Sequence, residues 1–136
     1  MLFTPAETKV VVVGGGTMGA DVAAVCARGG CAVQVVEPTT ERRALLPDYF
    51  VNTMTELGYE NRIHLLSVAG SLEEVDWSEI DLVIECVPER LDIKQELFAK
   101  LEKYAKPEAV LASNSTSFPI SEIANGLKTA ARMIGL

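Results

Sequence analysis

Short apolar runs alternate with amphipathic segments along this chain. Residues 9–13 (KVVVV) form a β-branched run that ends at three glycines, and residues 81–87 (DLVIECV) form a second such run. Continuous apolar runs of this length are typical of parallel strands that are buried on both faces. The strands predicted in this way are residues 9–13, 32–36, 63–69, 81–87 and 109–112, with a further strand beginning in 133–136.

The first intervals between these runs predict helices. One helix is expected from Thr17 to the Gly29-Gly30 pair, because glycine ends helices. Residues 39–62 have helical composition but contain Pro47 and Gly58, so we expect one broken helix or two short ones. The apolar face predicted for the first helix consists of Met18, Val22, Val25 and Cys26.

The second half of the chain continues the alternation. A strong amphipathic helix is predicted from Pro88, a residue suited to the first helical position, to Pro107. Residues 72–80 predict a short helical connection, and residues 119–127 predict a last helix. The apolar face of the strong helix consists of Ile93, Leu97, Leu101 and Tyr104, with lysine and glutamate opposite. The whole pattern predicts an α/β fold, a doubly wound Rossmann-type parallel sheet with helices on both faces.

Length and charge limit what such a chain can do. Its 136 residues correspond to one domain, with 49% apolar and 23% charged residues, as in ordinary globular proteins. The formal net charge of −7 argues against sequence-independent binding to nucleic acid or to an anionic membrane. No apolar run approaches the roughly 20 residues of a membrane helix, and a signal-peptide pattern is missing. We therefore expect neither a nucleic-acid nor a membrane partner.

The cysteines and the single histidine point to no metal site. Cys26, Cys31 and Cys86 are an odd number without a CxxC spacing, which predicts reduced, partly buried thiols in a cytoplasmic protein. His64 is the one histidine, and with three scattered cysteines it does not form a zinc-binding pattern.

Residues 14–19 (GGGTMG) satisfy the pattern G-x-G-x-x-G between a predicted strand and a predicted helix. Gly14 would allow the tight turn, Gly16 the approach of the backbone to a pyrophosphate, and Gly19 close packing of helix and strand. The N-terminus of the helix would then hold the phosphates. The residues predicted to bind the dinucleotide are Gly14, Gly15, Gly16, Thr17, Met18 and Gly19. The alternative is a glycine-rich turn without a ligand.

Glu37 lies at the end of the next predicted strand, 18 residues past Gly19. It is expected to accept hydrogen bonds from the adenosine ribose hydroxyls and to repel a 2′-phosphate, which favours NAD over NADP. Arg42 and Arg43 follow on the next helix, where we expect them to be solvated. Asp21 is an acid near the helix end that would face pyrophosphate, so we expect it to point away.

Five longer segments follow one another in a specific order: KVVVVGGGTMGADVAAVCARGG, VVEP, DLVIECVPERLDIKQELFAKL, VLASNSTSFPISEIA and RMIGL. In this order they resemble the NAD-binding domain of L-3-hydroxyacyl-CoA dehydrogenases. The E-x-V-P-E and S-N-S-T-S segments are much more specific than the glycine loop, and the resemblance is weakest between residues 39 and 62. It implies NAD as the cofactor and oxidation of a 3-hydroxyl group to a ketone in fatty acid metabolism.

The resemblance implies roles for four further residues. Glu89 and Lys94 match the pair that contacts the nicotinamide half of NAD, although the pattern alone indicates a first-turn helix acid and a solvated lysine. Asn114 and Thr116 match catalytic-site positions, and Asn114 would also contact the cofactor; alone they indicate a polar turn. Thr116 stands where the family has a serine whose hydroxyl lies near the reacting oxygen.

Three departures affect the expected substrate and activity. Thr116 and the ECVPE segment also resemble lambda-crystallin-type relatives that oxidise free hydroxy acids such as L-gulonate. No lysine lies between Lys9 and Lys94, whereas the family binds coenzyme A with lysines of a helical hairpin. We hypothesise that the substrate is not a CoA thioester or is bound differently. The family's general-base histidine follows the strand that ends at Leu136, and His64, expected in the third strand, is no replacement.

We therefore expect residues 1–136 to be a single NAD-binding Rossmann domain, with a helical substrate and dimerisation domain outside this chain. The complete enzyme, a homodimer, would oxidise a 3-hydroxyacyl substrate of the 3-hydroxyacyl-CoA type to the 3-keto product by hydride transfer to NAD. This chain alone would bind dinucleotide without turnover. The alternatives are an NAD-dependent dehydrogenase of a free hydroxy acid of the gulonate or carnitine type, a non-catalytic NAD(H)-sensing module, and a crystallin-like structural protein.

Overall fold

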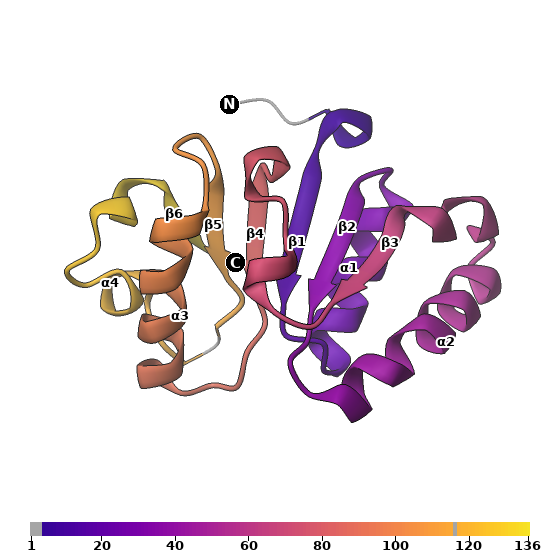
Figure 1. The fold of residues 1–136 in the computed structure, drawn as a ribbon, viewed down its shortest axis with the longest axis horizontal. Coiled ribbons are helices and arrows are strands. Elements are labelled where there is room, and N and C mark those ends of the chain that lie inside the picture. Colours follow the sequence, from indigo (N-terminus) through magenta and orange to yellow (C-terminus); the bar gives the residue numbers. More distant parts are fainter. Residues whose placement is uncertain (1–3, 116) are drawn as a thin grey trace.

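The computed structural model describes residues 4–115 and 117–136. They form a six-stranded sheet in the order β3-β2-β1-β4-β5-β6, and every neighbouring pair of strands is parallel (Figure 1). The strands are β1 (Lys9–Val13), β2 (Ala32–Val36), β3 (Leu66–Ala69), β4 (Leu82–Glu85), β5 (Val110–Ser113) and β6 (Met133–Gly135). The predicted doubly wound parallel sheet is confirmed.

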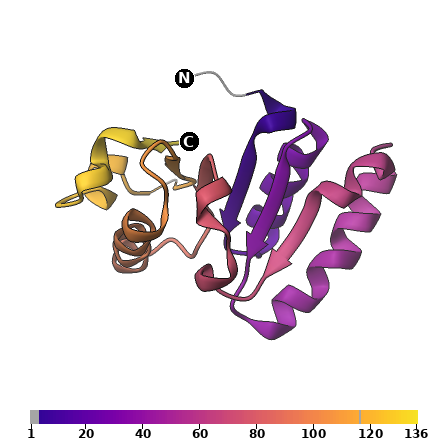
Figure 2. The ribbon, with the colours of Figure 1, turned by 45° about the horizontal axis from the view of Figure 1, so that its top comes forward.

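Helices cover the two faces of the sheet in separate groups. They are α1 (Thr17–Arg28), α2 (Thr40–Glu56), α3 (Leu91–Tyr104) and α4 (Ile120–Ile123). The two views of the ribbon place α1 and α2 beside β1, β2 and β3, and place α3 and α4 beside the other half of the sheet (Figures 1 and 2). Alternate residues of β1 serve the two cores, since Val10 and Val12 pack with α1 while Val11 and Val13 pack on the face of α3.

The strand order reverses between β1 and β4. The chain proceeds from β1 outward to β3, then returns to β4 at the centre and proceeds outward to β6. Open α/β sheets bind their ligands outside the carboxyl ends of the strands at such a switch point. The end of β1 at Val13 and the end of β4 at Glu85 are therefore where a site is expected.

The prediction of a broken helix around Pro47 is wrong. Helix α2 runs without interruption through Pro47, and Gly58 lies just beyond its end. A proline inside a helix removes one hydrogen bond and costs about 3 kcal/mol. Here Leu46, Phe50 and Met54 are buried on one side of α2, and this packing holds the helix together across the proline.

The predicted apolar face of α1 is only partly right, because Val22 and Cys26 pack against the core but Met18 and Val25 do not. Met18 and Val25 are more than half exposed, at 58% and 57%. The buried residues of α1 are Gly19, Ala20, Ala23, Ala24 and Ala27. The small side chains on this face let the helix approach the sheet closely. The size of the side chains, more than their hydrophobicity, therefore determines which face of α1 is buried.

Several predicted boundaries shift because tertiary contacts decide them. Residues 63–65 belong to a 3-10 turn, Glu60–Leu65, so His64 is exposed in that turn and not in the third strand. Helix α3 begins at Leu91, three residues after Pro88, and α4 is only four residues long. The buried stripe of α3 consists of Lys94, Phe98 and Leu101, so a lysine occupies the side predicted to be apolar.

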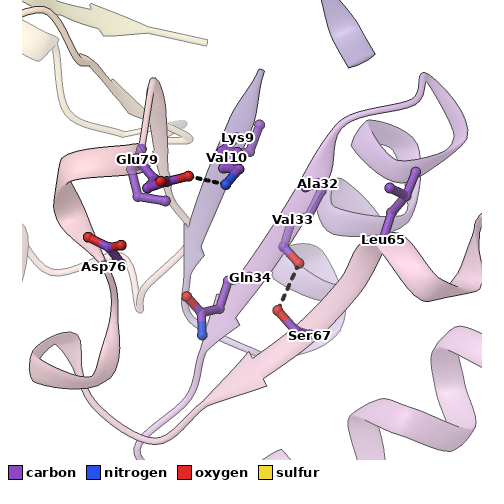
Figure 3. A pocket seen from close by; sticks show the side chains of 10 residues that line it. Lys9, Val10, Ala32, Val33, Gln34, Leu65, Ser67, Asp76 and Glu79 are labelled. Atoms are coloured by element: carbon purple, nitrogen blue, oxygen red, sulfur yellow. Dashed lines mark hydrogen bonds and ion pairs between the residues drawn. The ribbon is translucent and has the colours of Figure 1, made fainter. Parts of the chain in front are cut away.

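The connection from β3 to β4 is short. It forms two 3-10 turns, Leu72–Glu74 and Trp77–Glu79, where a short helix was expected. Beside these turns a hollow of about 420 Å³ lies on the sheet, and Gln34 and Ser67 line it (Figure 3). Lys9 and Glu79 form an ion pair at its edge. None of the helices formed by the described residues is long and apolar enough to span a membrane.

Candidate cofactor-binding site

In the glycine loop between β1 and α1, Gly14 and Gly19 are packed against other backbone atoms, whereas Gly16 is not. A side chain at Gly14 would place its Cβ 2.5 Å from the Cys86 carbonyl oxygen, and one at Gly19 would place it 1.8 Å from the Gly14 carbonyl oxygen. Gly14 also has a φ of +106°, which disfavours other residues. A Cβ at Gly16 meets nothing within 4 Å. Gly14 and Gly19 therefore serve the packing of the loop, while Gly16 faces open space.

The N-terminus of α1 offers backbone donors to that open space. Gly16 is the N-cap residue, and no side chain caps the helix. The first N–H groups of a helix have no acceptor within it, and the helix dipole adds partial positive charge there. Asp21 accepts a hydrogen bond from the Tyr49 hydroxyl and is thus turned toward α2, which agrees with its expected orientation. The donors at the start of α1 can hold an anionic group such as pyrophosphate.

Glu37 connects the glycine loop to the end of β2. Its side chain is buried, Oε1 accepts a hydrogen bond from Gly15 N–H at 2.8 Å, and Oε2 accepts one from Thr39 N–H at 2.8 Å. Arg43 donates to the Glu37 carbonyl oxygen at 2.8 Å. The expectation that Arg43 is merely solvated is therefore wrong, because its guanidinium holds the backbone beside Glu37. Each carboxylate oxygen of Glu37 keeps a second lone pair for a ligand.

A cleft of about 820 Å³ extends along the carboxyl ends of β1, β2 and β4. This volume lies in the range of small-molecule and cofactor sites. Among the predicted residues, the cleft is lined by Gly14, Gly16, Thr17, Met18 and Glu37. Its opposite wall consists of Cys86, Val87, Pro88, Ile93, Glu96, Leu97 and Lys100. Gly15 is buried, and a Cβ there would lie 2.9 Å from the Glu37 side chain and 3.0 Å from Leu46.

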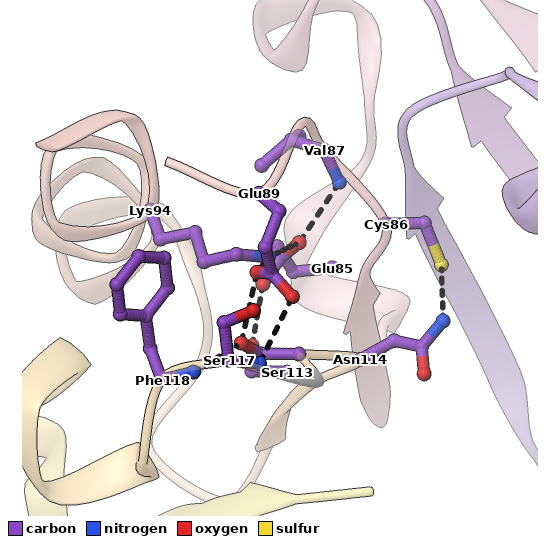
Figure 4. A network of polar contacts seen from close by, with 10 residues as sticks. Glu85, Cys86, Val87, Glu89, Lys94, Ser113, Asn114, Ser117 and Phe118 are labelled. Carbon is purple, nitrogen blue, oxygen red and sulfur yellow. Dashed lines mark hydrogen bonds and ion pairs between the residues drawn. The ribbon is translucent and has the colours of Figure 1, made fainter. Parts of the chain in front are cut away.

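A buried polar network lies at the end of β4 (Figure 4). The Glu85 and Lys94 side chains have no exposed surface, and Lys94 Nζ lies 2.6 Å from Glu85 Oε2. Glu85 Oε2 also accepts a hydrogen bond from Val87 N–H at 2.8 Å, and Oε1 accepts one from the Ser113 hydroxyl. Lys94 Nζ is 3.2 Å from Glu89 Oε1 as well. One ammonium group thus stands between two carboxylates.

Glu89 connects this network to the loop after β5. Its Oε1 accepts a hydrogen bond from the Ser115 hydroxyl at 2.9 Å, and its Oε2 accepts one from Ser117 N–H at 3.2 Å. Asn114 Nδ2 lies 4.0 Å from Cys86 Sγ, which lines the cleft. The Asn114 side chain therefore stands next to the cleft. Thr116 lies outside the described residues.

Residues 9–136 match the family model of the 3-hydroxyacyl-CoA dehydrogenase NAD-binding domain. The chain belongs to this family. It is 37% identical to a 3-hydroxybutyryl-CoA dehydrogenase of Mycobacterium tuberculosis over 98% of this chain and 50% of that protein. It is 31% identical to the human mitochondrial hydroxyacyl-coenzyme A dehydrogenase, over 93% of this chain and 45% of that protein. The chain thus spans about half the length of these curated relatives.

Solved structures of dehydrogenases share the fold. The 3-hydroxybutyryl-CoA dehydrogenase of Escherichia coli superimposes with a TM-score of 0.84 at 31% identity, over 96% of this chain and 29% of that one. A diketoreductase superimposes with a TM-score of 0.86 at 24% identity, which shows a common fold. These structures agree with the Rossmann-type sheet found here.

The residues of this NAD-binding domain fit the family's cofactor. Gly16 faces open space, the start of α1 carries uncapped backbone donors, and the buried Glu37 carboxylate stands at the end of β2. A dinucleotide needs these features for its pyrophosphate and its adenosine ribose. NAD is the cofactor of this domain family.

The sequence did not predict two residues of the buried polar network, Glu85 and Ser113. Glu85 ends the apolar run of β4, and a carboxylate at the end of a fully buried strand could have signalled a paired charge. Ser113 pairs with Glu85 across the two strands, and only the sheet register reveals it. Lys94 was expected to touch the cofactor, whereas its side chain is fully buried.

Cys86 provides a chemical probe of the cleft. Burial raises the pKa of its thiol to about 11, and the Glu85 carboxylate contributes to the rise. Because the thiolate is the reactive form, alkylation by iodoacetamide should be slow near pH 7 and accelerate about tenfold per pH unit toward pH 11. Burial also raises the pKa of Cys26 to about 11, so peptide mass mapping must separate the two. Excess NADH should protect Cys86 and leave Cys26 unaffected; rapid labelling of Cys86 at neutral pH would contradict this.

Proposed function

We propose that this chain binds NAD(H) as the cofactor half of an enzyme that oxidises a 3-hydroxyacyl-CoA-type substrate to the 3-keto product. The open space over Gly16 beside the uncapped start of α1 is the observation that supports it most directly. NAD, when bound, would accept the hydride that leaves the carbinol carbon. The general-base histidine, the helical second domain, the homodimer and the cytoplasmic location stay predictions.

In the proposed site each residue group orients one part of the cofactor. Gly14 and Gly19 keep the loop compact, and the backbone N–H groups of Thr17 and Met18 would donate to the pyrophosphate. Glu37 would accept hydrogen bonds from the adenosine ribose hydroxyls through its remaining lone pairs. Glu89 and Asn114 are proposed to contact the nicotinamide half, with Thr116 near the reacting oxygen.

The substrate class rests on the relatives, which are 3-hydroxybutyryl-CoA and hydroxyacyl-CoA dehydrogenases. Helix α2 is continuous through Pro47, which removes one argument against a CoA thioester as the substrate. The absence of lysine between Lys9 and Lys94 still favours a mode of CoA binding that differs from the family's hairpin. An NAD-dependent dehydrogenase of a free hydroxy acid is the alternative.

Titration calorimetry with NADH and NADPH tests the proposed cofactor site. NADPH should bind about 100-fold more weakly than NADH, because a 2′-phosphate would stand against the Glu37 carboxylate and like charges at an interface cost several kcal/mol. Glu37→Gln should lower the ratio of the NADPH Kd to the NADH Kd, because it removes the negative charge. Glu79→Gln, at the amino ends of the strands, is the matched control and should leave the ratio unchanged. Equal binding of the two dinucleotides, or no binding, would overturn the proposal.

A further inference from the structure

The buried ion pair at the end of β4 has a function that rests on the proposed dinucleotide binding. We propose that Glu85 is a positioning residue for the nicotinamide end of the site. It fixes the Lys94 ammonium behind Glu89, and Glu89 in turn fixes the loop after β5. In this arrangement Lys94 acts through Glu89.

Glu85 connects three segments of the chain. Its donors are Lys94 of α3 at 2.6 Å, Val87 N–H of the loop after β4 at 2.8 Å, and the Ser113 hydroxyl at the end of β5. Both carboxylate oxygens are used, and the side chain has no exposed surface. A buried carboxylate with this many donors has one orientation available, so it holds the ammonium group in one place.

Lys94 passes this position on to Glu89. The ammonium group is fully buried, 2.6 Å from Glu85 Oε2 and 3.2 Å from Glu89 Oε1. The Glu89 side chain is 32% exposed. Of the two carboxylates and the ammonium, Glu89 is therefore the group that can reach a ligand.

Glu89 holds two described residues of the loop after β5, Ser115 and Ser117. Glu89 Oε1 accepts from the Ser115 hydroxyl at 2.9 Å and Oε2 accepts from Ser117 N–H at 3.2 Å. The Ser115 hydroxyl in turn accepts a hydrogen bond from Phe118 N–H at 3.1 Å. Asn114, which contacts Cys86 at the cleft, directly precedes these residues. The buried Glu85 carboxylate at the carboxyl end of β4 thus acts, through Lys94 and Glu89, on the loop that is proposed to face the nicotinamide ring (Figure 4).

The variant Glu85→Gln isolates the charge of this group. The amide oxygen can take the place of Oε2 toward Lys94 and Val87, and the amide nitrogen can donate to the Ser113 hydroxyl, which rotates to accept. Shape and hydrogen-bond number are kept, so the variant should fold, as thermal denaturation will show. Of the two groups that face the ammonium, Glu89 is then the one that carries a negative charge, so the ammonium is held less tightly and can shift.

Two probes distinguish positioning from a structural role. NADH carries the nicotinamide ring, whereas ADP-ribose lacks it. In Glu85→Gln the Kd of NADH should rise about tenfold, the effect of weakening one charged hydrogen bond to a neutral one, while the Kd of ADP-ribose should stay unchanged. Ser113→Ala, which removes one donor from Glu85, should raise the Kd of NADH by a smaller factor and leave the Kd of ADP-ribose unchanged, and it serves if Glu85→Gln does not fold.

The matched control is Asp81→Asn at the other end of the same strand. Asp81 directly precedes β4, pairs with Lys106 Nζ at 2.8 Å and accepts from Lys9 N–H at 2.9 Å. Its substitution also removes an ion pair, far from the loop after β5, and should leave the ratio of the NADH and ADP-ribose Kd values unchanged.

The outcomes separate the inference from the proposed function. An equal loss of NADH and ADP-ribose affinity in Glu85→Gln would show a merely structural role and overturn the inference, as would no loss for either probe. Binding of both probes by the unaltered chain would still uphold the cofactor site in these cases. If the unaltered chain bound neither probe, the proposed function would fall and this inference with it.

Discussion

Replacing Lys94 with methionine is expected to lower the free energy of unfolding by about 3–5 kcal/mol, the usual cost of removing one partner from a buried ion pair. Methionine keeps most of the side-chain volume but removes the charge that stands between Glu85 and Glu89. The fully buried Glu85 carboxylate would keep only the Val87 and Ser113 donors. Urea unfolding followed by circular dichroism measures the change.

Two further variants control this experiment. Lys100→Met removes an exposed partner of Glu96, at 3.8 Å one turn away on α3, and should change stability by less than about 0.5 kcal/mol. The double variant Glu85→Gln with Lys94→Met should be more stable than Lys94→Met alone, because it no longer buries an unpaired carboxylate. If Lys94→Met cost no more than Lys100→Met, the ion pair would not stabilise the fold as described.

Replacing Gly16 with valine should abolish NADH binding, with at least a 100-fold rise in Kd, about 2.7 kcal/mol, and leave the fold intact. Gly16 has a φ of −73° and a ψ of −172°, an extended conformation that any residue adopts. Apart from its chain neighbours, a Cβ there meets nothing within 4 Å, so the side chain would fill the space through which the backbone would approach the pyrophosphate. NADH fluorescence titration and thermal denaturation measure the two effects separately.

Gly19→Val provides the contrast within the same loop. A Cβ at Gly19 would lie 1.8 Å from the Gly14 carbonyl oxygen, so this variant should lose stability as well as binding. Gly29→Ala, at the far end of α1 where the backbone is helical, should change neither the stability nor the NADH affinity by much. A Gly16→Val protein that bound NADH normally would place the dinucleotide elsewhere.

The parts of the site that depend on local chain geometry could be predicted from the sequence. The glycine loop, the acid at the end of β2 and the alternation of strands and helices are set by neighbouring residues, and the doubly wound parallel sheet was predicted from that alternation. The buried Lys94 could not be predicted, because its environment depends on Glu85 of another element, nine residues away in sequence. Helix α2 continues through Pro47 because Phe50 and Met54 are anchored in the core, a contact that helix propensity does not describe.

The face of α1 illustrates the same limit. Hydrophobicity selected Met18 and Val25 as buried, yet the helix turns its alanines to the sheet. The contact of α1 with the Gly14 turn at Gly19 fixes this rotation. A steric rule for the glycine loop thus predicts the buried face better than the hydrophobic pattern does.

The hydrogen bond from Gly15 N–H to Glu37 affects any attempt to redesign the cofactor preference. Exchanging Glu37 for a small or basic residue, the usual route toward a phosphorylated ribose, would also remove the acceptor that restrains the phosphate loop. In the proposed site, recognition of the sugar and recognition of the pyrophosphate would therefore be energetically coupled through one side chain. A successful redesign has to supply a new acceptor for Gly15 together with the new sugar contact.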